Sequence, residues 1–226
     1  MPTRSPSPLL AAVVILVAAA AVAVFIAVSA GIASGRAVGD PFASVSPNAI
    51  VYFVPLDAHA RRLVERTVPA LKPWLLPNQV LQVAPTRRSW ADSSRSGELN
   101  DVAMATDLLA SFRRDNGDRP VAIFSVSSKW LYDPDIPEYR FVFGGWVQPT
   151  RGEYSVVFGT APMRAVQPQR EQMRLEKMML RYIGEILCTP YLRVSSDPGS
   201  VMYSPILGTA DLDRMTATLP AYCRHH

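Results

Sequence analysis

Strand-like and helix-like segments alternate along residues 49–187, and this order restricts the fold more than any other feature of the sequence. Runs rich in β-branched and aromatic residues predict five strands, at 49–55, 80–83, 120–126, 139–145 and 154–159. Apolar residues at helical spacing predict helices at 58–76, 99–112 and 168–187. The polar or proline-containing segments 86–98 and 130–137 are predicted loops. This order predicts one α/β domain with a five-stranded mixed sheet and about three helices.

The segment 9–33 is an uncharged apolar run of 25 residues. A helix of this length can span a hydrocarbon core of about 30 Å. We therefore expect a short tail (1–8), a transmembrane signal anchor or uncleaved signal peptide (9–33), a linker (34–47) and a domain (48–226). Arg4 before the run favours a cytoplasmic N-terminus, so we expect a single-pass membrane protein with an extracytoplasmic domain. The alternative is secretion after cleavage near Ala30.

The charge distribution argues against a nucleic-acid partner. The chain has a net charge of +4, and its basic residues occur as scattered pairs such as those at 61–62, 87–88 and 113–114. No cluster alternates basic and aromatic residues, as nucleic-acid-binding surfaces do. The membrane, contacted through the N-terminal helix, is the first expected partner.

The chain contains two cysteines, Cys188 and Cys223. In an oxidising compartment such a pair is a candidate disulfide with only one connectivity. Two buried free thiols are the alternative, because a bridge requires the two Cα atoms to lie within about 7 Å of each other.

The most informative motif lies at the end of the long predicted helix and in the segment after it. It reads Arg-Tyr-Ile-Gly-Glu-Ile-Leu-Cys-Thr-Pro-Tyr at 181–191 and Ser-Val-Met-Tyr at 200–203. Over about residues 48–223 the chain resembles the metzincin zinc proteases, and the archaemetzincins most of all. Their motif is H-E-x-x-H-x-x-G-x-x-H, followed by a methionine turn. The resemblance places the three histidines at Arg181, Glu185 and Tyr191, the glutamate at Tyr182 and the methionine turn at Met202.

The motif lacks the residues that bind and use zinc in that family. A catalytic zinc needs three strong ligands and one open position, and the glutamate activates the bound water. The only histidines, His59, His225 and His226, lie outside the motif. Arg181 would repel a cation, and Tyr182, with an ordinary pKa of about 10, is no base near neutral pH. We therefore expect no catalytic zinc or other cofactor, and a chain that is not an enzyme.

Two more expectations follow from the resemblance. Arg181 and Glu185 share a helix face, so they form either an ion pair where the relatives bind zinc or two unrelated charges on a solvated surface. A bridge between Cys188 and Cys223 would replace the family's structural zinc. Three of the four cysteine positions for that zinc carry other residues, namely Leu192, Ser200 and Pro220.

The resemblance also suggests where a partner would bind. The substrate cleft of the fold is lined by an antiparallel edge strand, here 139–145, which makes Phe141, Val142, Phe143 and Gly144 the candidate binding residues. An extended peptide can pair with such an edge. We predict a membrane-tethered pseudoprotease domain that binds an extended peptide or a protein. The alternatives are a structural or interaction domain with a filled cleft, and a zinc-dependent protease with other ligands.

Overall fold

The computed structural model describes residues 49–75, 80–82, 97–116, 120–149, 153–187, 195–219 and 223. All of them belong to one of the two units into which the chain divides, Gly35–His226. Within these ranges no helix is long and apolar enough to cross a membrane. The predicted tail, anchor and linker lie outside the described residues.

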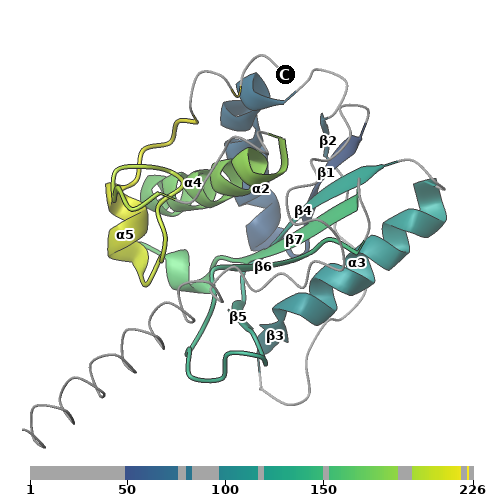
Figure 1. Cartoon of the computed structure of the whole chain (residues 1–226), viewed down its shortest axis with the longest axis horizontal. Coiled ribbons are helices and arrows are strands. Elements are labelled where there is room, and N and C mark those ends of the chain that lie inside the picture. Colours follow the sequence, from purple (N-terminus) through teal and green to yellow (C-terminus); the bar gives the residue numbers. More distant parts are fainter. Residues whose placement is uncertain are drawn as a thin grey trace, which may run out of the picture. The chain divides into compact units, whose positions relative to one another are not determined.

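A mixed sheet of five strands forms the centre of the domain (Figure 1), as predicted. In spatial order its strands are β2 (Val80–Gln82), β1 (Ile50–Pro55), β4 (Val121–Ser127), β7 (Glu153–Gly159) and β6 (Gly144–Val147). The first four are parallel, whereas β6 pairs with β7 in the antiparallel sense, with Gly145 opposite Val157. β6 is thus an edge of the sheet that runs against its neighbours.

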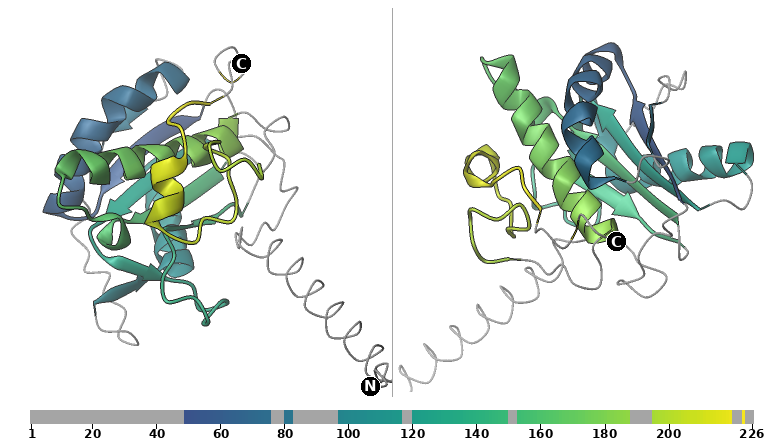
Figure 2. Two further views of the ribbon diagram at one scale, coloured as in Figure 1. Left: turned by 90° about the vertical axis from the view of Figure 1, so that its left-hand side faces the viewer. Right: turned by 90° about the horizontal axis from the view of Figure 1, so that it is seen from above.

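Helices cover both faces of the sheet, which explains why its central strands read as unbroken apolar runs. The helices α2 (Ala58–Leu71) and α4 (Pro168–Leu187) lie on one face, and α3 (Asp101–Asn116) lies on the other (Figure 2). Alternate strand residues serve two cores. Phe124 and Phe158 pack on the side of α2 and α4, and Ile123 packs on the side of α3.

Short elements complete the described part of the chain. They are the 3-10 helices η1 (Lys72–Trp74) and η2 (Ala161–Met163), the helix α5 (Thr209–Arg214), and a small parallel sheet of β3 (Glu98–Asn100) and β5 (Trp130–Tyr132). With α5 the domain has about four helices, whereas about three were predicted. The predicted loop at 130–137 is wrong where β5 forms, and the predicted loop at 86–98 is wrong at Glu98, the first residue of β3. Each of these strands exists by pairing with the other, and local sequence does not report such a contact.

Three predicted boundaries also differ. The helix expected at 58–76 ends at Leu71 and continues as η1, where Pro73 has no backbone N–H to extend the helix. The helix expected at 99–112 begins at Asp101, because the preceding residues belong to β3. The strand expected at 139–145 begins only at Gly144. Before it, the Val142 N–H donates to the Leu131 carbonyl at 3.0 Å, so this backbone bonds to β5.

Candidate functional site

The motif residues of α4 form an ion pair beside the methionine turn. Arg181 Nε lies 3.2 Å from Glu185 Oε1, and Arg181 Nη1 donates to the backbone carbonyl of Tyr203. Arg181 is 8% exposed and the side chain of Glu185 is 27% exposed, so the pair is partly buried. Met202, which precedes Tyr203, is buried in the core on the α4 side of the sheet. Of the two arrangements considered for these charges, the structure forms the ion pair.

Two buried tyrosines complete this cluster. The Tyr182 ring packs edge-on against Phe158, with the centroids 5.4 Å apart, and its hydroxyl donates to the Gly144 carbonyl over a long 3.4 Å. Tyr154 on β7 is 4% exposed, and its hydroxyl has no hydrogen-bond partner among the described residues. A buried donor without a partner costs about 1–3 kcal/mol, so this hydroxyl calls for an explanation.

Burial controls the protonation of the cluster. It raises the pKa of Tyr154 and of Tyr182, and the charge of Glu185 raises both further, while Arg181 opposes the change. Both hydroxyls therefore remain neutral donors at physiological pH. Burial also raises the pKa of Glu185, again against the effect of Arg181. Tyr182 thus cannot replace the glutamate base of the family motif.

The edge strand β6 adjoins this cluster through Tyr182. The Gly159 N–H donates to the Phe143 carbonyl at 3.1 Å, which makes these two residues a hydrogen-bonded pair. Such pairs alternate along an antiparallel ladder, so Gly145 bonds toward β7 while Gly144 and Trp146 direct their N–H and C=O groups away from it. In the described residues, β6 has no second strand on that outer side.

Only part of the predicted binding segment lies on this edge. Gly144 opens β6, whereas the Phe143 carbonyl is bonded to Gly159 and the Val142 N–H to Leu131. Phe141 is partly buried between other rings, with centroids 5.0 Å from Trp130 and 5.3 Å from Phe143. The sequence analysis missed Trp146, whose ring stacks on Tyr154 at 5.3 Å. No local pattern marks it, because residues 144–147 read Gly-Gly-Trp-Val and their alternating burial arises only in the folded sheet.

The described motif residues do not fit a zinc ion. The position of the first ligand carries a guanidinium, and the carboxylate at the second position is paired with it. Tyr191, at the third position, lies outside the described residues. Within the described ranges, no group of three or more His, Cys, Asp and Glu residues is arranged to hold a metal.

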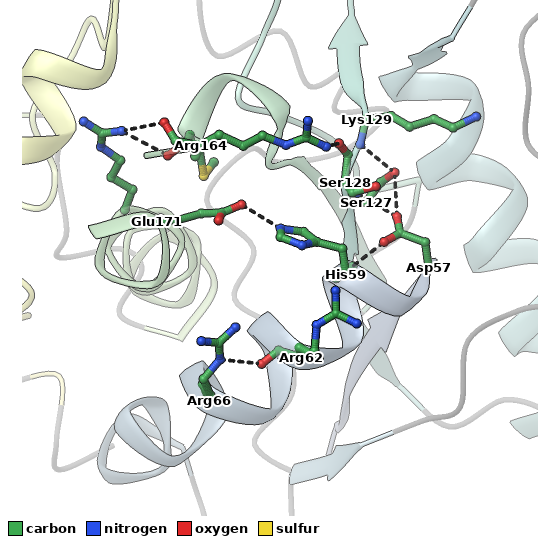
Figure 3. A network of polar contacts seen from close by, with 12 residues as sticks. Asp57, His59, Arg62, Arg66, Ser127, Ser128, Lys129, Arg164 and Glu171 are labelled. Atoms are coloured by element: carbon green, nitrogen blue, oxygen red, sulfur yellow. Dashed lines mark hydrogen bonds and ion pairs between the residues drawn. The ribbon is translucent and has the colours of Figure 1, made fainter. Parts of the chain in front are cut away.

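His59 belongs to a separate polar network, shown in Figure 3, that joins α2, α4 and the end of β4. Its Nε2 lies 2.8 Å from Glu171 Oε1 on α4. Asp57 accepts from the backbone N–H groups of Ala60 and Ser128, at 2.9 and 2.7 Å. Despite its burial, these hydrogen bonds hold the pKa of Asp57 below its ordinary value. The network caps the N-terminus of α2 and links this helix to α4 and to the end of β4. It does not include the motif residues Arg181, Tyr182 and Glu185.

The predicted disulfide stays a prediction. Cys223 is 8% exposed, and Cys188 lies outside the described residues, as do His225 and His226.

A buried carboxyl packs against β6 on the α3 face of the sheet, opposite α4. Asp101, the first residue of α3, is 1% exposed. A Cβ atom on Gly145 would lie 2.0 Å from Asp101 Oδ2, so only glycine fits at this position of the strand. Burial, and then the charge of Asp133, raise the pKa of Asp101 to about 7. The sequence analysis did not identify this residue, because its burial depends on how α3 packs against the sheet edge.

Comparison with known proteins relates this fold to metallopeptidases. No protein-family model and no curated protein sequence matches the chain. The crystal structure of archaemetzincin from Methanopyrus kandleri has 20% identity and a TM-score of 0.54, and the match covers 79% of this chain and 93% of that one. Archaemetzincin from Archaeoglobus fulgidus in complex with malonate has 20% identity and a TM-score of 0.52, and the match covers 76% of this chain and 96% of that one. A zinc-dependent peptidase from Methanocorpusculum labreanum has 18% identity and a TM-score of 0.58, and the match covers 78% of this chain and 98% of that one.

These likenesses show an archaemetzincin-like fold and correct one prediction. The expectation that the chain is not an enzyme is contradicted, because all three similar structures are named as archaemetzincins or as a zinc-dependent peptidase. The expectation rested on the replaced motif residues alone. Their replacement does not by itself show that activity has been lost.

Proposed function

We propose that this metalloprotease-like domain binds an extended peptide along the outer edge of β6. The observation that carries the proposal is the free edge itself. Gly144 and Trp146 direct their backbone groups away from β7, and β6 has no strand on that side in the described residues. An extended peptide can add a strand to such an edge through main-chain hydrogen bonds.

Backbone pairing alone would hold a peptide only weakly. Tyr182 already donates to the Gly144 carbonyl, so the N–H and C=O of Trp146 carry most of the pairing. Each hydrogen bond contributes a net of about 0.5–1.5 kcal/mol, and even millimolar binding requires about 4 kcal/mol. Side-chain contacts must supply the rest. The partly exposed rings of Phe141, shortly before β6, and of Trp130 on β5, which it contacts, are suited to apolar peptide side chains.

Pairing can be tested with the full-length chain in detergent micelles and the peptide fluorescein-Val-Thr-Val-Thr-Val, by fluorescence polarisation. Trp146→Pro removes the outward N–H, which an edge strand tolerates, and Trp146→Ala removes the ring alone. We expect Trp146→Pro to bind at least about twofold more weakly than Trp146→Ala, the effect of one hydrogen bond. Equal affinities, or no binding by the unaltered chain, would contradict the proposal. Mass spectrometry of the same peptide shows whether it is also cut.

We further propose that the Arg181–Glu185 pair takes the place of the catalytic zinc, so that the domain carries no such cofactor. The buried guanidinium at a ligand position supports this. Elemental analysis of the purified chain should find well below one zinc per chain. A stoichiometric, chelator-sensitive zinc would refute the proposal.

We propose that residues 9–33 anchor the chain in a membrane, with the domain on the extracytoplasmic side and no nucleic-acid partner. The uncharged length of this segment and the preceding Arg4 support the orientation. The chain should remain in the membrane fraction after alkaline carbonate extraction, and its domain should be digested by protease added to intact spheroplasts or cells. Release by carbonate would favour a secreted protein cleaved near Ala30.

A purely structural role for the domain is the second candidate. The deep burial of Arg181 and Tyr182, each 8% exposed, favours it because buried side chains offer little surface to a ligand. It predicts no peptide binding in the assay above.

A further inference from the structure

We infer that the motif residues of α4 form a receptor for a carboxylate, and that this carboxylate is the C-terminus of an extended peptide lying on β6. The inference rests on the proposed function and names the chemical class of its ligand. It concerns three side chains, namely Arg181, Tyr182 and Tyr154, which we call the donor cluster.

The guanidinium of Arg181 is held in place but is not saturated. Its Nε faces Glu185 at 3.2 Å and its Nη1 donates to the Tyr203 carbonyl. Neither of these contacts uses the third nitrogen, Nη2. Buried guanidinium groups take carboxylates as hydrogen-bond acceptors, often through two nitrogens at once.

Two hydroxyl groups also lack a good acceptor. The Tyr154 hydroxyl is buried and has no partner among the described residues, and the Tyr182 hydroxyl has only a long bond of 3.4 Å to Gly144. Tyr154 stacks on Trp146 of β6 and lies in the same core as Tyr182, and the charges of Glu185 and Arg181 act on its hydroxyl. These three donors are under-used although Glu185 already pairs with Arg181, so an anionic acceptor suits them better than a neutral one. A metal cation or a further donor would leave these groups unsatisfied.

The strand direction places a peptide C-terminus at this cluster. Antiparallel pairing, the more stable arrangement, makes a peptide on β6 run from Val147 toward Gly144. Its backbone pairing stops at Gly144, whose carbonyl accepts from Tyr182. A peptide whose C-terminus lies at the end of this pairing therefore places its carboxylate beside Tyr182, one residue along α4 from Arg181. Capture of a terminal carboxylate is a known mode of peptide recognition.

Glu185 is the competing acceptor, and it makes binding depend on pH. Among the described residues, the ionisable groups that act on one another at the site are Arg181, Glu185 and Tyr182 on α4 and Tyr154 on β7, with Asp101 of α3 acting on Tyr182. Burial raises the pKa of Glu185, whereas a peptide C-terminus ionises near pH 3.5. As the pH falls toward the pKa of Glu185, its carboxylate is neutralised before that of the peptide. Affinity should therefore rise on mild acidification.

The test compares two forms of the fluorescein-Val-Thr-Val-Thr-Val peptide, with a free C-terminal carboxylate and with a C-terminal amide, on the full-length chain in micelles. We expect the amide to bind at least about tenfold more weakly, the effect of one charge-assisted hydrogen bond. Arg181→Gln should weaken binding of the carboxylate peptide to the level of the amide. Glu185→Gln should strengthen binding of the carboxylate peptide at pH 7 and abolish its pH dependence.

A second variant separates recognition from folding. Tyr154→Phe removes a buried hydroxyl without a partner, so it should leave the melting temperature unchanged or raise it, yet weaken binding of the carboxylate peptide severalfold. A structural role alone would not weaken binding. If both peptides bind equally and both respond to Trp146→Pro, the carboxylate receptor is refuted and edge pairing stands. If neither peptide binds, the proposed function fails and this inference fails with it.

Discussion

Asp101 should make the stability of the domain fall as the pH rises through neutrality. Its carboxyl is 1% exposed and lies against Gly145 of β6. Burial, followed by repulsion from Asp133, raises its pKa from 3.8 to about 7. The unfolded chain, with the ordinary value, therefore loses this proton at a lower pH than the folded chain does.

The sign and the size follow from linkage. Because the folded pKa lies above the unfolded one, the free energy of unfolding is highest below about pH 4 with respect to this group. It decreases between about pH 4 and pH 7 and is lowest above pH 7. At about 1.4 kcal/mol for each pKa unit, the total decrease is about 4 kcal/mol. This is the cost of holding a charged carboxylate between α3 and the sheet edge.

Asp101→Asn removes the charge, keeps the shape and retains an acceptor for the Val102 N–H, now bonded at 2.7 Å. We expect the substitution to raise the free energy of unfolding at pH 8 by up to about 4 kcal/mol and to change little at pH 4. Urea unfolding of the full-length chain in micelles, followed by tryptophan fluorescence from pH 4 to pH 8, measures both values.

The matched control is Asp107→Asn, an exposed carboxylate on the same helix, which should change stability by less than about 0.5 kcal/mol at every pH. An Asp101→Asn chain that gains the same stability at pH 4 and pH 8 would refute the linkage argument. So would one that is less stable than the unaltered chain at pH 8.

Three further predictions follow from the packing and the cysteines. Gly145→Ala should destabilise the domain by about 1–3 kcal/mol in urea unfolding, because its Cβ would lie 2.0 Å from a buried carboxyl oxygen, whereas Gly199→Ala, which meets only an exposed carboxylate at 3.3 Å, should be nearly neutral. Arg174→Ala should lower stability by about 1–3 kcal/mol, and Arg174→Lys should rescue little, because the buried guanidinium on α4 holds the partly exposed Asp213 through two bonds of 2.8 and 2.7 Å and also donates to the Met163 carbonyl at 3.0 Å. Membrane-isolated, unreduced chain should show no thiol that reacts with maleimide, and reaction of Cys188 and Cys223 without reductant would refute the bridge.

Elements with strong local patterns were predictable from the sequence. The helix at 168–187 is observed with those bounds, since its apolar residues recur at helical spacing and a proline suits its first turn. The strands β1, β4 and β7 were predictable as well, because a strand covered on both faces is apolar throughout. In contrast, β3 and β5 are each only three residues long and depend on each other, so no local pattern marks them.

The residues of the candidate site were also predictable only in part. The spacing of Arg181 and Glu185 placed them on one helix face, and this suffices for the ion pair. The participation of Tyr154, Trp146 and Asp101 was not predictable. These residues reach the site from β7, β6 and α3, and only the antiparallel register and the packing of α3 bring them there.

The sequence by itself determined the class of the fold, because burial on one or two faces leaves its period in the order of apolar residues. It also determined that the positions of the motif carry no histidine. The tertiary structure decided what those positions now do. A guanidinium on α4 is buried, a tyrosine hydroxyl on β7 has no partner among the described residues, and an edge strand runs past both. Whether each of these groups is buried or hydrogen-bonded depends on residues that are distant in the sequence, and only folding brings those residues together.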